Sequence, residues 1–194
     1  MKRSIVALFA PVCLLLTSCT FVACKEPVGT PVKEGIAEKF DGTWQAAGSV
    51  MHVKFLGDGR VLVASISDEK EGFKLSQQTV IVTMIDKGMY ANFPLPAEGK
   101  PQCYALARVA EGGGGNNPLV LYGPKFNVFS AAVEGGKLPG EVKKESEAVT
   151  SVTISDRAAL EKFIRERPVS ELFNVEEPLV LTRIGEPKKE KKSK

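Results

Sequence analysis

The chain has 194 residues, of which 43% are hydrophobic and 25% are charged, and its formal net charge is +3. This length is enough for one domain with a sizeable hydrophobic core. Lys2 and Arg3 contribute +2 and the lysine-rich tail over 186–194 contributes +3, so the body between Cys19 and Gly185 is left with −2. This balance provides no basic face, and we expect no nucleic-acid partner.

The first eighteen residues have the pattern of a secretory signal. Lys2 and Arg3 form a positive start, and Ile5–Leu16 is an apolar stretch too short to span a bilayer, where about 20 residues are needed. The following Leu16-Thr17-Ser18-Cys19 resembles the lipobox of bacterial lipoproteins, in which an aliphatic and two small residues precede the cysteine that receives the lipid. The resemblance implies that residues 1–18 are a signal peptide, removed together with Cys13, and that Cys19 is the lipid attachment residue.

Two other interpretations of this segment stay open. Thr17, Ser18 and Thr20 could precede the cut of a plain secretory signal, and Phe21-Val22-Ala23-Cys24 is a poorer lipobox because its first residue is aromatic. With Cys19 as the anchor, we expect the protein in the bacterial cell envelope, attached to a membrane through the lipid. Thr20 follows this cysteine, and in this respect the chain resembles lipoproteins that are sent to the outer membrane. In a cell with two membranes we therefore expect the outer one.

Residues 19–38 show no apolar period and are rich in Pro, Gly and charged residues, which predicts a flexible tether. A single β-rich domain is expected after it, over 39–185. With Cys19 lipidated, Cys24 and Cys103 are the only pair left for a disulfide, and the compartment beyond the inner membrane is oxidising enough for one. Cys24 falls in the tether, however, and Cys103 fits a buried strand residue, so their pairing stays open.

The first half of the domain predicts an antiparallel meander of strands. Met51, Val53 and Phe55 alternate with polar residues, which is the period of a half-buried strand. Gly57-Asp58-Gly59 is a strong hairpin signal, and Asp86-Lys87-Gly88 predicts a second turn. The returning strands are expected over 60–66, 73–85 and 89–93.

The second half mixes strands with two short helices. Strands are expected over 104–110, 119–122, 151–155 and 179–184. One helix is predicted to start with Pro124 as its first residue and to end at Gly135, and the other to be capped by Asp156 and ended by Pro168. The Gly112–Gly115 run is followed by a strand and not by a helix, so we expect a mobile loop and no phosphate site. The tail over 186–194 is expected to be disordered.

Gly42-Thr43-Trp44 at the start of the first strand resembles the opening signature of lipocalins and lipocalin-like bacterial lipoproteins. In that family the tryptophan plugs the closed end of an up-and-down barrel, and an arginine from a late strand stacks on it. The resemblance implies a barrel-plug pair of Trp44 and Arg183, with Arg108 as the second candidate arginine. The expected fold is therefore mainly β (α+β), as an antiparallel lipocalin-like barrel or a curved sheet, with two short helices packed on it. The chain departs from the family after residue 94, because helices fall among its later strands and a strand ends it.

No residue pattern in the chain points to catalysis. His52 is the only histidine, it is expected to face water, and one histidine cannot build a multi-histidine metal site. No Gly-x-Ser-x-Gly elbow is present, and nothing local supports a nucleophile pair of Cys103 with His52. We therefore expect no catalytic residues, no cofactor and no metal.

The expected function is that of a non-enzymatic binding module in the cell envelope. Its partner would be a small apolar or amphipathic ligand or an envelope protein. The alternatives are a structural or assembly role in the envelope and an enzyme of unrecognised type, since catalytic residues can converge from distant segments. The sequence leaves the oligomeric state open.

Overall fold

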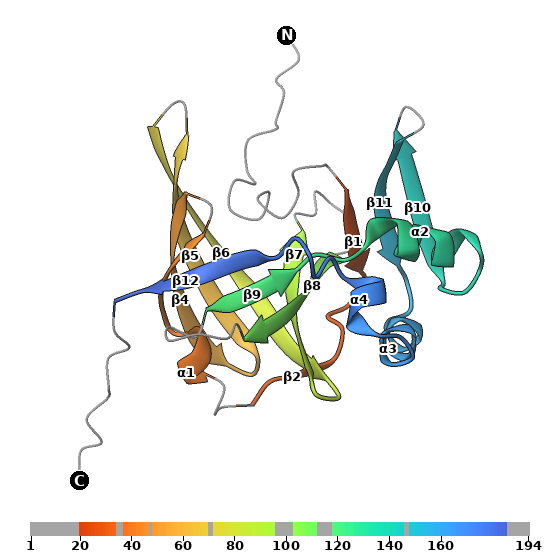
Figure 1. Ribbon diagram of the computed structural model, residues 1–194, viewed down its shortest axis with the longest axis horizontal. Helices are drawn as coiled ribbons and strands as arrows, with labels where there is room; N and C mark the ends of the chain where they lie inside the picture. Colours follow the sequence, from red (N-terminus) through yellow and green to blue (C-terminus); the bar gives the residue numbers. More distant parts are fainter. Residues whose placement is uncertain are drawn as a thin grey trace.

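The fold is seen in a computed structural model, which describes residues 20–33, 37–46, 48–69, 72–95, 103–111, 118–145 and 148–185. The predicted signal peptide with Cys13, the predicted anchor Cys19, the Gly112–Gly115 run and the tail over 186–194 lie outside the described residues, and the predictions for them stay predictions. Within the described residues the chain is mainly β, with four short helices (Figure 1).

An antiparallel barrel of eight strands forms the larger part of the described chain (Figure 1). The strands pair in the order β3-β4-β5-β6-β7-β8-β9-β12, and β12 pairs back with β3, so the ring is closed. Closure gives the backbone groups of every strand a partner, which an open sheet would leave exposed at its edges. The prediction of an antiparallel β fold is confirmed, and of its two forms the structure has the barrel. The strands are β3 (Gly42–Ala46), β4 (Ser49–Gly57), β5 (Arg60–Glu69), β6 (Gly72–Ile85), β7 (Gly88–Leu95), β8 (Cys103–Glu111), β9 (Leu119–Tyr122) and β12 (Leu179–Ile184).

The turn between β4 and β5 lies where the sequence predicts it. Asp58 and Gly59 are its central residues and both have positive φ, at 51° and 72°. A Cβ at Gly59 would come within 2.6 Å of the Val82 carbonyl oxygen, so the turn packs closely against β6. Glycine therefore serves both the backbone conformation and the close approach at this position.

A second part of the sheet extends from the start of β8. There β1 (Phe21–Cys24) pairs antiparallel with β8 and parallel with β11 (Ala148–Ile154), and β10 (Gly140–Glu145) pairs with β11. The end of β8 pairs instead with β9, so the sheet divides along this strand. The strand β10 is missed by the sequence analysis because Gly-Glu-Val-Lys-Lys-Glu has no apolar alternation, and its pairing with β11 makes it a strand.

Three helices pack against this extension: α2 (Phe126–Glu134), α3 (Arg157–Arg165) and α4 (Val169–Leu172). The two predicted helices are α2 and α3, and Asp156 caps α3 as predicted, because its carboxylate accepts a 3.0 Å hydrogen bond from the Ala159 N–H. Gly135 ends α2 as predicted. Pro124 is not the first residue of α2, since it forms a bridge with Phe173 and the helix begins two residues later.

The prediction of a flexible tether is wrong for residues 20–33. Val22, Ala23 and Cys24 in β1 are at most 1% exposed, and Val28 and Val32 are also buried. After β1 the segment crosses the outside of the barrel and pairs with β6 through β2 (Thr30–Pro31) before the single turn α1 (Ala37–Phe40). The domain therefore begins at β1 and not at residue 39. The prediction failed because the apolar residues are few and irregularly spaced, and strands far along the chain bury them.

Two hydrophobic cores lie on the two sides of the barrel wall. One fills the barrel interior and includes Trp44, Val53 and Val80. The other lies outside the barrel, between β1, β11, the outer faces of β7 and β8, and the helices, and includes Phe129, Phe163 and Phe173. The strand β7 is buried on both faces because it separates the two cores.

Candidate functional site

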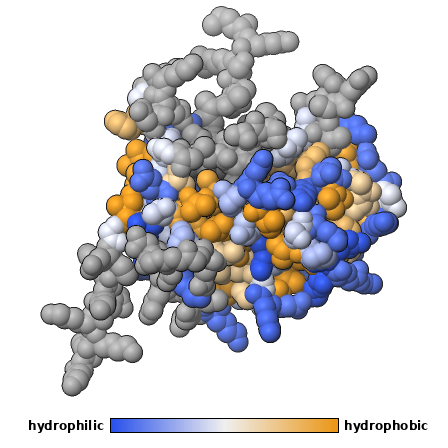
Figure 2. Space-filling view, in the orientation of Figure 1, coloured by the Kyte–Doolittle hydropathy of each residue, from blue (hydrophilic) through white to orange (hydrophobic). Residues whose placement is uncertain are grey.

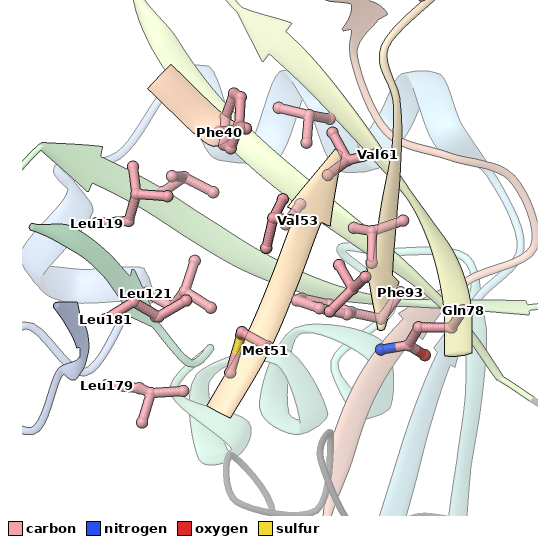
Figure 3. Close-up of a pocket in the computed structure, with 15 residues that line it drawn as sticks. Phe40, Met51, Val53, Val61, Gln78, Phe93, Leu119, Leu121, Leu179 and Leu181 are labelled. Carbon is pink, nitrogen blue, oxygen red and sulfur yellow. The ribbon is translucent and has the colours of Figure 1, made fainter. Parts of the chain in front are cut away.

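The interior of the barrel contains an apolar cavity (Figure 3). Successive residues of a strand point to opposite faces of the sheet, so alternate residues of each barrel strand reach the interior. Fifteen side chains line the cavity, and they come from α1 and from every barrel strand except β3. They are Phe40, Met51, Val53, Val61, Val63, Gln78, Val80, Val82, Ala91, Phe93, Val109, Leu119, Leu121, Leu179 and Leu181.

The lining of the cavity suits a hydrocarbon ligand. All of its lining side chains are apolar except Gln78. The volume open to the centre of a water-sized sphere is about 80 Å³. On that measure one water needs roughly 10–15 Å³, so the cavity has room for a short run of heavy atoms. Without polar partners a cavity of this kind holds water poorly and favours an apolar guest.

The two ends of the cavity differ. Phe40 of α1 lies at one end, and Gln78 lies at the other, together with Met51 and Phe93 (Figure 3). The end at Gln78 is on the side of the β5–β6 hairpin, because β6 runs from that hairpin through Gln78 toward Val82. A ligand with one polar group would therefore place its hydrocarbon toward Phe40 and its polar group toward the amide of Gln78.

Trp44 is completely buried beside the Phe40 end of the barrel. Its indole N–H donates a 2.9 Å hydrogen bond to the Phe40 carbonyl oxygen, and the Arg183 guanidinium lies 4.6 Å from the centre of its ring. Arg183 also donates a 3.1 Å hydrogen bond to the Lys39 carbonyl oxygen. The structure thus brings together the two residues that the lipocalin resemblance pairs, since β12 places Arg183 directly opposite Trp44 on β3. Arg108, the second candidate, lies over Tyr90 instead, 4.9 Å from its ring centre.

The spacing of Gly42 and Trp44 has a physical reason in this arrangement. The two residues are two positions apart on β3 and so share a face. A Cβ at Gly42 would lie 3.4 Å from the Arg183 Nη1, and Gly42 has φ +143°. Any other residue would be strained at this φ, whereas glycine adopts it freely while the Arg183 guanidinium lies directly against the backbone.

The structure joins no disulfide between Cys24 and Cys103. In the pairing of β1 with β8, Cys24 is opposite Tyr104, so Cys103 falls at the next position and its side chain points to the other face of the sheet. A bridge between the two faces would need the strands to distort. Burial raises the pKa of the Cys24 thiol, which makes it a poor nucleophile.

His52 is exposed, as the sequence predicts, and its Nδ1 lies 3.3 Å from the Thr43 Oγ1. The nucleophile pair of Cys103 with His52 is not formed, because Cys103 belongs to the opposite side of the ring, on β8. Among the described residues, no three His, Cys, Asp or Glu side chains gather where they could hold a metal ion.

Polar contacts that no sequence pattern predicted hold residues 28–29 to the barrel. Asn92 is completely buried: its Oδ1 accepts a 2.8 Å hydrogen bond from the Val28 N–H, and its Nδ2 donates 3.0 Å bonds to the Ile81 carbonyl and to Thr83 Oγ1. Such a satisfied buried amide fixes one arrangement of the backbone around it. A polar residue within the otherwise apolar run Tyr90–Phe93 is the signal that could have indicated this role.

Glu161 of α3 also binds the backbone of residues 28–29, at Gly29. Its Oε1 accepts hydrogen bonds from the Gly29 N–H at 2.9 Å and from Arg157 Nε at 2.7 Å, and Arg157 also donates to the Gly29 carbonyl. Burial by itself would raise the pKa of Glu161, but these bonds and one from Arg165 outweigh it and hold the pKa below its ordinary value. The carboxylate is therefore a structural clamp.

In the part of the chain that the structure describes, no helix combines the length and the apolar character required to cross a bilayer. No family model matches the chain, and neither the curated proteins nor the solved structures that were compared with it include a match. The candidate site therefore depends on the geometry of the barrel and on the residues that line it.

Proposed function

We propose that this protein is a lipid-anchored lipoprotein of the bacterial cell envelope whose barrel binds a small apolar or amphipathic ligand without chemically changing it. The apolar cavity in the barrel is the observation that carries the proposal. Largely preformed concave sites with a mostly apolar lining and a few placed polar groups are the usual form of small-molecule sites. The lipobox Leu16-Thr17-Ser18-Cys19 supports the location.

The cavity favours a ligand with a single alkyl chain. Its open volume of about 80 Å³ suits a narrow guest better than a fused ring system, and its walls offer only dispersion and burial of apolar surface. One polar group at the Gln78 end suits a hydroxyl, carboxyl or ester head, to which a side-chain amide can both donate and accept. A fatty acid or the acyl chain of a lipid has this combination.

Several features support a lipocalin-like relationship for the barrel. The strands β3 to β8 follow one another around the barrel in chain order, Gly42 and Trp44 open the first of them, and Arg183 lies on the Trp44 ring. The later part differs from that family, because β10, β11 and the helices stand between β9 and the closing strand β12. We propose Trp44 and Arg183 as the plug of the closed end, with the ligand in the cavity beyond Phe40.

A binding experiment on the chain from Thr20 onward tests the ligand site. This chain lacks the anchor and keeps every element of the described structure. A fluorescent fatty acid is titrated into the protein and into two variants. Ala91→Leu adds three carbons to a lining residue and should weaken binding about tenfold or more by filling the cavity. Ala64→Leu is the matched control, because Ala64 lies on the outer face of β5, between the inward-facing Val63 and Ser65.

The expected result is strong loss of binding in Ala91→Leu and none in Ala64→Leu, with both variants folded. Added carbons in a core cost about 1–3 kcal/mol, so circular dichroism of both variants separates a loss of binding from unfolding. Binding that persists unchanged in a folded Ala91→Leu variant would show that the fatty acid does not enter the cavity. Hydrolysis of an ester substrate that depends on a single residue of the folded protein would contradict the non-enzymatic part of the proposal.

A further inference from the structure

Four large apolar side chains form an exposed patch on the outer face of the barrel, at the end that carries the β5–β6 hairpin. Val50, Ile66 and Leu75 stand side by side on β4, β5 and β6, because Val50 is paired with Ile66 and Ile66 with Leu75. Phe73 is two residues from Leu75 on the same face. Their exposed fractions are 40%, 50%, 74% and, for Phe73, 82%. Figure 2 shows apolar atoms at the edge of the molecule where Figure 1 places this hairpin.

The patch is unusual because the alternation of β5 and β6 brings apolar residues to both faces. The inner face at this level is polar, with Ser65 and Ser76 joined by a 2.8 Å hydrogen bond between their hydroxyls. The apolar side chains at the hairpin therefore point to solvent, where they contribute nothing to the core. A contiguous exposed apolar patch of this kind marks a contact with a protein or a membrane.

The position of the proposed anchor favours a membrane. Cys19 is two residues before Phe21, and two residues of chain reach at most about 7 Å. Since Val22 is 1% exposed and fixed between β8 and β11, no tether separates the anchor from the body of the protein. The lipid on Cys19 would hold the side of the molecule at the start of β1 against the bilayer.

The hairpin lies toward that same side. Figure 1 shows the start of β1, the end of β10 and the end of β5 directed toward one side of the molecule. The parallel pairing of β1 with β11 agrees with this view, because it places the start of β1 toward the β10–β11 tip.

From these observations we infer that the patch formed by Val50, Ile66, Phe73 and Leu75 contacts the surface of the bilayer in which the protein is anchored. This inference rests on the lipid anchor proposed above. The sequence that joins β5 to β6, Asp68-Glu69-Lys70-Glu71, is charged, so the outer faces of the two strands and not this charged stretch enter the interface. The Gln78 end of the cavity lies on the hairpin side, so this docking would turn the polar end of the cavity toward the membrane.

Fluorescence quenching in vesicles tests the contact. The full lipidated protein is placed in phosphatidylcholine vesicles whose acyl chains carry bromine, which quenches indole emission at close range. Phe73→Trp and Leu75→Trp each put an indole into the patch at an exposed position, where a substitution should leave the fold intact. Leu56→Trp is the matched control, since Leu56 is also exposed, at 46%, and lies on β4 about 20 Å further along than Val50. Trp44 is buried and supplies the same background in every protein.

The expected result is that Phe73→Trp and Leu75→Trp lose most of their added emission in brominated vesicles relative to unbrominated ones, and that Leu56→Trp loses none. Flotation of the same samples shows whether the protein is membrane-bound. A protein that floats with the vesicles but shows no quenching at Phe73 and Leu75 overturns the docking and leaves the anchor intact. Equal quenching at Leu56 also overturns it, because the contact would then not be confined to the patch. A protein that does not float overturns the anchor and the docking together.

Discussion

The contact between Trp44 and Arg183 can be measured by a double-mutant cycle with Trp44→Ala and Arg183→Met. Trp44 is fully buried and its N–H is bonded to Phe40, so Trp44→Ala should cost about 3–5 kcal/mol of unfolding free energy, the usual range for a large core aromatic. Arg183→Met keeps the aliphatic stem and removes the charge. It should cost about 1 kcal/mol for the half-buried cation–π contact and about 1 kcal/mol for the hydrogen bond to Lys39.

The double variant separates these contributions. The cation–π contact is lost in each single variant but can be lost only once in the double variant, so the two single costs should exceed the double cost by about 1 kcal/mol. The hydrogen bond to Lys39 does not involve the indole and should cancel from the cycle. Urea unfolding of the chain from Thr20 onward, followed by far-ultraviolet circular dichroism, gives the four free energies without relying on indole emission.

Arg60→Met is a suitable control, because Arg60 is exposed on β5 and its replacement should change the free energy by less than about 0.5 kcal/mol. Costs of the two single variants that add within about 0.3 kcal/mol would refute a stabilising contact between Arg183 and the Trp44 ring. A cost well below 1 kcal/mol for Trp44→Ala would refute the plug role altogether.

Three further results are expected from changes elsewhere in the chain. Cys19→Ala should leave the precursor unprocessed or release the protein from the membrane fraction, as seen by fractionation and immunoblotting, whereas processing lost only in Cys24→Ala would assign the anchor to the second box. Asn92→Ala should cost about 1–3 kcal/mol in urea unfolding, because the buried Val28 N–H loses its acceptor, and a neutral result would contradict the fastening role. The folded-state pKa of Glu161 is lowered, so its stabilising contribution is present above its unfolded-state pKa of about 4.3 and is lost as the pH falls through the lower folded value. The unfolding midpoint of Glu161→Gln should therefore fall less than that of the parent on acidification below about pH 4, and equal falls would contradict the clamp.

Short segments of sequence determined those parts of the fold that depend on residues close together in the chain. The alternation of Met51, Val53 and Phe55, the turn at Asp58-Gly59 and the cap at Asp156 all depend on neighbours within a few residues, and the structure has each of them. The antiparallel meander follows from such local signals, because tight turns between alternating strands leave no other pairing.

Only the tertiary structure decided which distant segments meet. The burial of Val22–Cys24 comes from strands whose paired residues are eighty or more positions away, and the closure of the ring requires β12 to pair with β3. No local period encodes such contacts, so the sequence predicts a tether where residues 20–33 are in fact packed against the barrel, and it predicts no strand at β10. The cavity and the outer patch have the same origin, since each is formed by side chains from several strands that acquire a common face only when register and closure are set.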